Sequence, residues 1–506
     1  METTDRNVVI VIGDFDLDKS PFTQRNLELH RATLNTAPEL FNFTKAIIVA
    51  DFPGRFGLIK QCYEELFPLA QDHGLGLAVV VHSFDDFNQV AAIRKWGANG
   101  TTSKLFEIDK LWEAAEFAAR LRIGPSASNV LIQPSNIKLD DDEGLLFRRA
   151  FSDCERIYLE PISGGKASMS VYRVHAWMKQ SDVGPLPLPF FAKIGTPADV
   201  ESEKDKYQRY AELYISFNLR PNIDRHRCVQ TRARAALIGN FVDDAVPLRE
   251  ALRTGHGIGA LFSLFETTLK GFRLQPFASG SKPVAGYLES FVKDRIKVQD
   301  FLTKPDVVRR AKQYGLMANP QDLHDQICIA ARNLCCIIGP NHGDLHTGNV
   351  MVRGGDSILI DFASTTDGPL TADLATLEAS LMFGTESWET AKRFAEWSAF
   401  IDEIYGMAVT TLHPPALFEI KPGHFSWLRR SLRELRHVLL ACEGSGDEAK
   451  VVLAAYLMRY ARLDIETLKN EEAKTLAFDR HCYALAVAER IVKGFSTGAI
   501  AGGKKA

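Results

Sequence analysis

The first part of the chain alternates short apolar runs with segments of helical periodicity. Continuous apolar runs occupy residues 8–12, 46–50 and 77–81, and apolar positions three and four apart mark residues 24–34 and 58–70 between them. Strands that are apolar on both faces are typical of a parallel sheet with helices on both sides. The pattern predicts an α/β domain over residues 1–125.

Polar residues follow these predicted strands, where function gathers in open parallel sheets. They are Asp14, Asp16, Asp51, His82 and Ser83, with Lys104 after the next helix. The set Asp14, Asp51, Ser83 and Lys104 resembles the site of a response-regulator receiver domain, which has a flavodoxin-like fold. The spacing between Asp14 and Asp51 is short for an intervening strand and helix, and Leu105 stands where the family commonly has proline. An active receiver, a degenerate receiver and plain helix caps remain alternatives.

Residues 126–148 are predicted to be a linker. Gly124 and Pro125 lead into a stretch with Ser and weak periodicity, and an acidic run follows at residues 140–143. Composition of this kind is typical of connections between domains. The acidic run is interpreted as a solvated surface.

The next pattern, from residue 149, predicts strands around a glycine turn. Residues 159–174 are interpreted as strand, turn and strand, with Gly164 and Gly165 at the turn. Glycines let backbone N–H groups approach phosphate oxygens closely. A further apolar strand at residues 189–194 contains Lys193, and a charge buried there needs a partner or a ligand. The helix predicted at 200–215 carries Glu201 and Glu203 as candidate partners.

Two carboxylates and one carboxamide stand at short spacings in residues 341–363. Asp344 is followed five positions later by Asn349, and Asp361 ends the apolar run 357–360. Residues 351–356 contain Gly354-Gly355 and predict a hairpin that returns the strand to the same place. Phosphoryl transfer needs one group that orients the attacking hydroxyl and hard oxygen ligands that hold magnesium. Asp344 suits the first role, and Asn349 and Asp361 suit the second.

These residues closely resemble the aminoglycoside phosphotransferase and choline kinase branch of the protein-kinase-like fold. The matching elements are His342-Gly343-Asp344, Asn349, Asp361-Phe362 and Asp373-Leu374-Ala375. Thr347 stands where the family has proline. The resemblance implies an α+β bilobal domain, with a small lobe at 149–245 and a helical large lobe with the catalytic loop at 246–500.

The resemblance also implies roles for residues outside the motif. Lys193 would contact the α- and β-phosphates of ATP, and Glu203 fits the family's ion-pair partner of that lysine better than Glu201 does. His342 and Asp373 would support the catalytic loop structurally. Residues 236–242 would hold the purine base through backbone groups.

The large lobe is predicted to be mostly helical. Helical spacing marks residues 247–252, 259–269, 322–338, 432–440, 451–463 and 476–492. Within one of these helices Arg459 and Arg462 lie one turn apart. They could contact a substrate anion, but a solvated helix face is the favoured interpretation.

Composition adds limits to this interpretation. The chain has 506 residues, of which 46% are hydrophobic and 24% are charged, as is ordinary for a globular protein. Its net charge of −3 does not favour nucleic acid or an anionic membrane as a partner. No apolar run approaches the roughly 18 residues of a membrane-spanning helix. The polar start without a signal peptide, and eight cysteines without a Cys-x-x-Cys pair, indicate a cytoplasmic protein with reduced thiols.

The sequence therefore predicts a phosphotransferase that uses ATP and Mg²⁺ and an unidentified hydroxyl acceptor, expected to be a small molecule. Residues 1–125 would regulate it or bind a regulatory protein. One alternative is a nucleotide-binding pseudokinase that acts as a signalling or assembly scaffold. Another is a protein-directed kinase, although Phe362-Ala363-Ser364 favours the small-molecule branch.

Overall fold

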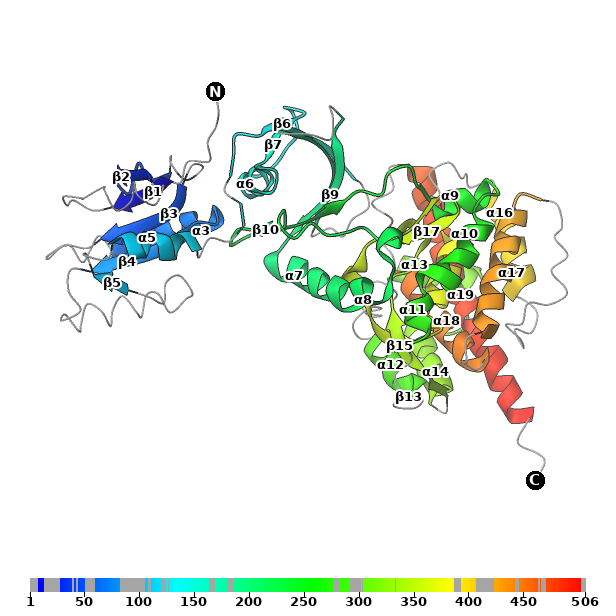
Figure 1. The fold of residues 1–506 in the computed structure, drawn as a ribbon. Coiled ribbons are helices and arrows are strands. Elements are labelled where there is room, and N and C mark those ends of the chain that lie inside the picture. Colours follow the sequence, from blue (N-terminus) through cyan, green and yellow to red (C-terminus); the bar gives the residue numbers. More distant parts are fainter. Residues whose placement is uncertain are drawn as a thin grey trace. The chain divides into compact units, whose positions relative to one another are not determined.

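The structure is a computed structural model of the chain, drawn in Figure 1. It describes residues 8–12, 28–38, 41, 44–50, 60–81, 105–107, 111–120, 124, 125, 127–162, 169–179, 186–275, 282–291, 302, 304–332, 334–385, 393–405, 423–441, 446–462, 465 and 470–501. The chain forms two compact units. The first contains Met1–Ser202 and Asn222–Phe241, and the second contains Glu203–Pro221 and Val242–Ala506.

The first unit begins with a parallel sheet, as the apolar runs predict. Its strands are β1 (Val8–Ile12), β2 (Glu28–Ala32), β3 (Thr44–Ala50), β4 (Gly76–Val81) and β5 (Leu105–Glu107). They lie in the order β2-β1-β3-β4-β5, and every neighbouring pair is parallel. This is the 2-1-3-4-5 order of one common class of doubly wound α/β sheets.

Helices pack against this sheet where the periodicity indicates them, with one exception. A π-helical turn (Cys62–Leu66) and α3 (Phe67–Asp72) occupy the segment expected to be helical at 58–70, and α5 (Leu111–Arg120) packs against β3 and β4. The helix expected at 24–34 is wrong, because β2 lies there and pairs in parallel with β1. β2 is an edge strand with exposed charged positions, so its spacing imitates that of a surface helix.

The four residues of the expected receiver-type site, Asp14, Asp51, Ser83 and Lys104, lie outside the described residues. The stretch between Asp14 and Asp51 nevertheless holds a strand, β2, so its length admits an element between β1 and β3.

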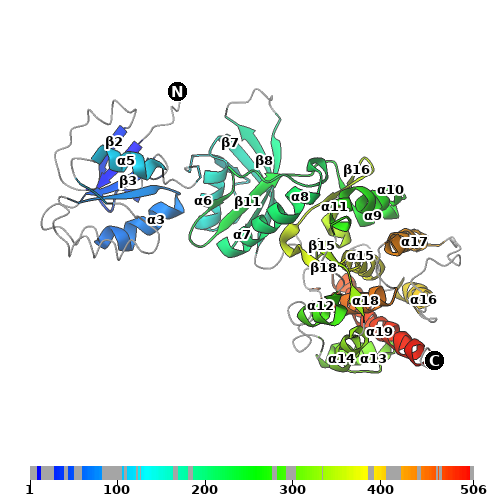
Figure 2. The same ribbon diagram turned by 60° about the horizontal axis from the view of Figure 1, so that its bottom comes forward.

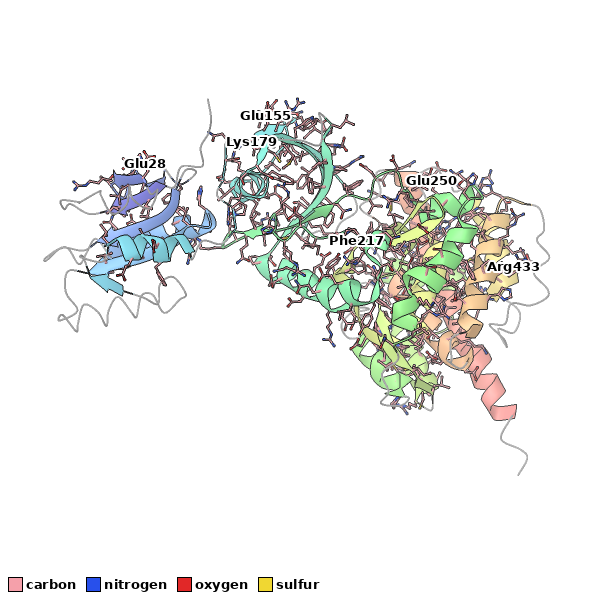
Figure 3. The ribbon with its side chains drawn as sticks, in the orientation of Figure 1. Glu28, Glu155, Lys179, Phe217, Glu250 and Arg433 are labelled. Carbon is pink, nitrogen blue, oxygen red and sulfur yellow. The ribbon has the colours of Figure 1, made fainter. Side chains whose placement is uncertain are left out.

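A second sheet of the first unit is mainly antiparallel and is visible in Figure 2. Its strands are β6 (Leu131–Gln133), β7 (Cys154–Pro161), β8 (Ser170–Met178), β9 (Leu188–Gly195), β10 (Val229–Gln230) and β11 (Ala235–Asn240), in the order β10-β11-β9-β8-β7-β6. β7 and β8 pair antiparallel, which confirms the two expected strands, and the turn expected between them lies outside the described residues. Lys179, labelled in Figure 3, donates to Ser152 O at 2.7 Å just after β8.

The prediction of a linker at 126–148 is wrong, because a strand and the start of a helix lie in this range. β6 pairs in parallel with β7, and α6 (Asp141–Ala150) packs its buried residues into the core of the same sheet. The acidic run begins this helix, because Asp140 Oδ1 accepts the N–H of Glu143 at 2.7 Å. Acidic residues at a helix N-terminus cap its free N–H groups and interact favourably with the positive end of the helix dipole. The run therefore starts a helix, with Asp140 and Asp141 exposed as expected and Glu143 buried.

Within the first unit, the guanidinium of Arg149 joins α6 to the end of α3. Arg149 is fully buried and donates to Asp72 O and Gln230 O at 2.7 Å and to Pro125 O at 3.2 Å. Asp72 is the last residue of α3, where a cation is favoured by the helix dipole. The side chain of Asp72 also pairs with Arg232 at 2.9 Å.

The helix expected at 200–215 is observed as one continuous helical path. It consists of α7 (Pro197–Lys206), a π-helical turn (Tyr207–Ala211) and α8 (Glu212–Tyr214). Tyr207, Tyr210 and Ala211 are buried on one side of it.

The second unit is mostly helical. Among the described residues, the α-helices that follow α8 are α9 (Leu248–Arg253), α10 (Ile258–Ser263), α11 (Lys270–Arg273), α12 (Val284–Phe291), α13 (Pro305–Gln313), α14 (Pro320–Ala331), α15 (Ala372–Phe383), α16 (Phe394–Tyr405), α17 (Ser426–Ala441), α18 (Gly446–Tyr460) and α19 (Glu471–Ala501). Every residue of α15 is buried, and α15 packs against α17, α18 and α19. No helix in the described part of the chain is both long and apolar enough to cross a membrane.

Short strands of the second unit carry the motif. β16 (Val350–Arg353) and β17 (Asp356–Leu359) form the hairpin expected around Gly354-Gly355, and β12 (Val246–Pro247) pairs with β16. β15 (Ile338–Asn341) pairs with β18 (Thr366–Pro369). The helix expected at 322–338 ends early, since α14 stops at Ala331 and Cys335–Cys336 form β14, which pairs with β13 (Lys282–Pro283).

Candidate functional site

One buried carboxylate anchors the start of the loop that carries Asp344. Asp373, in the first turn of α15, accepts the backbone N–H of His342 at 2.8 Å and that of Gly343 at 3.0 Å. The ring of His342 donates from Nε2 to Ile360 O at 3.0 Å. Hydrogen bonds to a carboxylate are stronger than those to a neutral acceptor. The loop is thus held to α15 on one side and to the end of the hairpin on the other.

Gly343 brings the loop against the turn that follows Asp361. Its φ is +75°, and a Cβ built on it would lie 2.2 Å from Ser364 O. A left-handed φ disfavours side chains, and a Cβ in that position would collide with backbone. Glycine is therefore required here for two separate reasons.

Asn349 links the segments of Asp344 and Asp361 through its carboxamide and its backbone carbonyl. Asn349 Nδ2 donates to Asp344 O at 2.9 Å, and the N–H of Ile360 donates to Asn349 O at 3.0 Å. Because Nδ2 is fixed by the first bond, Oδ1 is the atom of the carboxamide that suits a metal. One network of hydrogen bonds thus joins the three residues expected to carry the chemistry.

Asp361 adopts a left-handed backbone conformation at the end of the hairpin. Its φ and ψ are 64° and 78°, and it begins a 3₁₀ turn (Phe362–Ser364). Strained backbone of this kind in a non-glycine residue occurs where surrounding structure enforces it, often at functional sites. Phe362 is buried, and its ring centroid lies 5.5 Å from that of Tyr207 and 5.4 Å from that of His342. This packing fixes the turn that aims Asp361.

Thr347 departs from the family pattern and has a structural partner. Its backbone N–H donates to Ser380 Oγ at 3.1 Å, and the two hydroxyl oxygens lie 3.2 Å apart. A proline has no N–H and could not make the first bond.

The residue before Thr347 is His346, and burial lowers the pKa of its ring. Nδ1 of that ring accepts the N–H of Gly348 at 3.1 Å. The loop therefore carries a neutral imidazole at this position.

The strongest electrostatic partner of Asp344 is Arg459 on α18. Arg459 Nη2 lies 2.7 Å from Asp344 Oδ1, and Nη1 donates to Gly343 O at 3.2 Å. Burial alone would raise the pKa of Asp344, but the positive charge of Arg459 holds it below its ordinary value. Asp344 is therefore ionised at neutral pH. Interpreting Arg459 as part of a solvated helix face is wrong, since its side chain is only 13% exposed.

Two tyrosines stand beside Arg459. The hydroxyl oxygens of Tyr287, on α12, and Tyr456, on α18, lie 3.1 Å apart, and burial raises the pKa of both phenols. The ring of Phe291 lies 4.6 Å from that of Tyr456 and stacks on that of Tyr287. The sequence pattern marks helical spacing at 451–463, within which Tyr456 lies, but gives no signal that Tyr456 and Tyr287 meet beside Arg459.

The remaining residues expected at the site are distributed as follows. Gly164 and Gly165 lie outside the described residues. Lys193 is on β9 in the first unit, opposite Leu237 of β11 and Val171 of β8. Glu203, on α7, is buried and belongs to the second unit.

The donor set of Asn349 and Asp361 suits a hard cation. A carboxylate and a carboxamide oxygen are ligands that Mg²⁺ accepts, and this ion commonly takes its other ligands from water and phosphate. Within the described residues no cluster of three or more His, Cys, Asp or Glu side chains is arranged to hold a metal. A site that Asn349 and Asp361 share with phosphate oxygens fits the residues present.

Comparisons with known proteins give one partial family match. A family model described as Ternary complex associated domain 9 matches residues 315–469, which contain the motif and α15 to α18. No curated protein matches the sequence.

Several solved structures are similar to this chain at low identity. Aminoglycoside phosphotransferase APH(4)-Ia is 13% identical, with a TM-score of 0.39 over 66% of this chain and 93% of that one. A choline kinase from Cryptosporidium parvum is 13% identical, with a TM-score of 0.34 over 68% of this chain and 91% of that one. Amicoumacin kinase hAmiN is also 13% identical, with a TM-score of 0.32 over 63% of this chain and 86% of that one.

Proposed function

We propose that this protein is an ATP- and Mg²⁺-dependent phosphotransferase that moves the γ-phosphoryl group to a hydroxyl of a small acceptor. The observation that carries the proposal is the hydrogen-bond network of the motif. The side chain of Asn349 donates to the backbone carbonyl of Asp344, and the backbone carbonyl of Asn349 accepts the N–H of the residue before Asp361. The carboxylate of Asp373 accepts two backbone N–H groups at the start of the same loop. This network supports the proposal because it joins the carboxylate that would orient the acceptor to the segments that would hold magnesium.

Each residue has a distinct task in this proposal. Asp344, ionised at neutral pH, accepts a hydrogen bond from the acceptor hydroxyl and orients its oxygen. Asn349 and Asp361 would hold magnesium, which supplies charge neutralisation at the phosphates when it is bound. Asp373 and His342 keep the loop rigid. Most of the catalysis then comes from positioning and electrostatics, as phosphoryl transfer requires.

The nucleotide side of the proposal rests on the first unit and on the resemblance stated above. Lys193 would contact the α- and β-phosphates of ATP, Gly164 and Gly165 would approach them through backbone N–H groups, and Glu203 would pair with the lysine. The antiparallel pairing of β7 with β8, the strands that precede and follow these glycines in the sequence, supports this assignment. Residues 1–125 would regulate the enzyme, and the parallel sheet at the start of the chain supports the α/β fold that this proposal assigns to them.

A nucleotide-binding scaffold is the second candidate, and one observation favours it. Asp344 Oδ1 is occupied by Arg459, so the carboxylate is bound within the protein itself. A permanent bond of this kind would leave nucleotide binding intact and prevent transfer. The N-terminal domain would then be the partner-binding module.

The test is magnesium-dependent ATP turnover by the full-length protein across a panel of small hydroxyl compounds, with a parallel assay for phosphate on the protein itself. Asp344→Ala and Asp361→Ala should each reduce turnover on the order of a hundredfold or more. Asp306→Ala is the matched control, because Asp306 is on the exposed face of α13. ATP binding without turnover in the wild type, unchanged in both variants, would instead favour the scaffold, and phosphate on the chain would favour a protein-directed kinase.

A further inference from the structure

The carboxylate expected to orient the acceptor faces a cation. Arg459 comes from the last turn of α18, and its guanidinium contacts both the side chain of Asp344 and the carbonyl of Gly343. It therefore occupies one of the two oxygens with which Asp344 could receive a hydroxyl. For transfer to occur at that oxygen, something must draw the guanidinium away.

Arg459 has the donors needed to bind another anion. Between described residues its guanidinium makes two hydrogen bonds, out of the five N–H donors of an arginine. The planar fork of an arginine matches carboxylate or phosphate oxygens and binds them with paired, charge-assisted hydrogen bonds. A ligand anion could thus replace the carboxylate of Asp344 at no loss of hydrogen-bond quality.

The surroundings of Arg459 suit a small polar anion. The guanidinium lies 5.9 Å from the ring of Tyr456, whose hydroxyl meets that of Tyr287. Arg459 Nη2 lies 2.7 Å from Asp344 Oδ1, and an arginine is always charged, so a permanent positive charge lies at the carboxylate of Asp344. A cationic acceptor would be repelled by this guanidinium, and an anionic acceptor would be attracted to it.

We propose that Arg459 is the anion-recognition residue of the acceptor site, and that the acceptor is a small hydroxy compound carrying a carboxylate or phosphate group near the reacting hydroxyl. This inference rests on the proposed phosphotransferase function. Binding moves the guanidinium from Asp344 to the acceptor's anionic group, and Asp344 Oδ1 then receives the hydroxyl. The acceptor oxygen bonds to the γ-phosphorus as the bond from that phosphorus to the β–γ bridging oxygen breaks. Asp344 takes the hydroxyl proton, and ADP leaves with the bonding electron pair.

The test uses four acceptors with one three-carbon skeleton: glycerate, glycerol 3-phosphate, glycerol and 3-amino-1,2-propanediol. Phosphorylation is measured with ATP and Mg²⁺ for the wild type and for Arg459→Gln and Arg459→Lys. The matched control is Arg433→Gln, because Arg433 is a partly exposed arginine on α17 that pairs with Glu434. Circular dichroism and thermal unfolding establish that each variant is folded.

The expected result is that the wild type prefers the anionic acceptors and that the two anions differ enough to name the carboxylate or the phosphate as the recognised group. Arg459→Gln should raise KM for the preferred anion at least tenfold, with a smaller change for glycerol, and Arg459→Lys should restore part of the loss. A residue that only supports the fold would lower kcat alike for all four compounds. That outcome, or a preference for the neutral or cationic compound, overturns the inference and leaves the phosphotransferase standing.

A binding measurement separates the two proposals if no compound is phosphorylated. Glycerate and glycerol 3-phosphate are titrated by calorimetry into the nucleotide-free wild type and into Arg459→Gln. Binding of one of them to the wild type, weakened at least tenfold in the variant, upholds the anion site and removes the transfer reaction. Equal or absent binding in both proteins overturns the anion site as well.

Discussion

The carboxylate of Asp373 accepts the backbone N–H of His342 at 2.8 Å, in a part of the second unit where both residues are buried. Asp373→Ala leaves this N–H and that of Gly343 without an acceptor, so we expect the free energy of unfolding to fall by about 3 kcal/mol. Asp373→Asn keeps one acceptor oxygen and should lose less. Urea denaturation measures both, and Asp306→Ala, which breaks an exposed ion pair with Arg309, should change stability by less than about 1 kcal/mol. Equal losses in Asp373→Ala and Asp306→Ala would show that Asp373 does not anchor the loop.

Alanine substitutions at two glycines with positive φ distinguish the cost of backbone strain from the cost of a steric clash. Gly343→Ala adds a Cβ at 2.2 Å from Ser364 O, whereas Gly354→Ala, with φ of +59°, meets no described atom within 4 Å. We expect Gly354→Ala to cost about 1 kcal/mol through backbone strain alone. Gly343→Ala should cost more than twice as much and should also reduce ATP turnover, since the loop must shift. Equal costs, measured by chemical denaturation, would show that the loop yields freely.

Much of the fold follows from local patterns, and the exceptions have physical causes. Fully apolar runs identify β1, β3 and β4 because buried parallel strands have no polar face, and Gly354-Gly355 identifies the β16–β17 hairpin. The pattern does not identify β2, because an edge strand need not be apolar. Residues 126–148 have the composition of a linker, and the sequence does not display β6 and α6 because short elements are stabilised mostly by tertiary contacts.

The candidate site also has one part that the sequence displays and one part that it does not. The spacing of Asp344, Asn349 and Asp361 lies within one short segment, so the sequence displays it directly. Arg459 lies over a hundred positions later, and helical spacing identifies its face of α18 but not what that face contacts. A contact between distant segments depends on how helices pack, which a single sequence does not display.

Arg149 and Arg232 both bind Asp72, one through its carbonyl and the other through its carboxylate. Arg149→Met leaves three carbonyl oxygens without this donor, so the last turn of α3 should open more readily. Amide hydrogen exchange in α3 is expected to become at least tenfold faster. Arg232→Met is the control, because Arg232 is 54% exposed and a surface ion pair contributes little. Unchanged exchange in Arg149→Met would show that α3 does not depend on this contact.

Glu448 gives the second unit a stability that depends on pH. Its carboxyl is 1% exposed and lies 2.5 Å from Thr371 Oγ1, and burial raises its pKa from 4.5 to about 7. Between these two values the folded state binds more protons than the unfolded state, so the free energy of unfolding falls as pH rises from about 4.5 to about 7. The shift corresponds to roughly 3 kcal/mol. Above about pH 7 this contribution is lost and the slope due to Glu448 ends.

Glu448→Gln removes the titrating group and keeps a side chain of similar size. Urea denaturation of the wild type and the variant at pH 5, 6, 7 and 8 should therefore show a difference in stability that grows in favour of the variant up to about pH 7 and is constant beyond it. Glu434→Gln, at a partly exposed glutamate on α17, is the control for the substitution itself. A constant difference between Glu448→Gln and the wild type across this range would mean that Glu448 titrates with the same pKa in the folded and the unfolded chain.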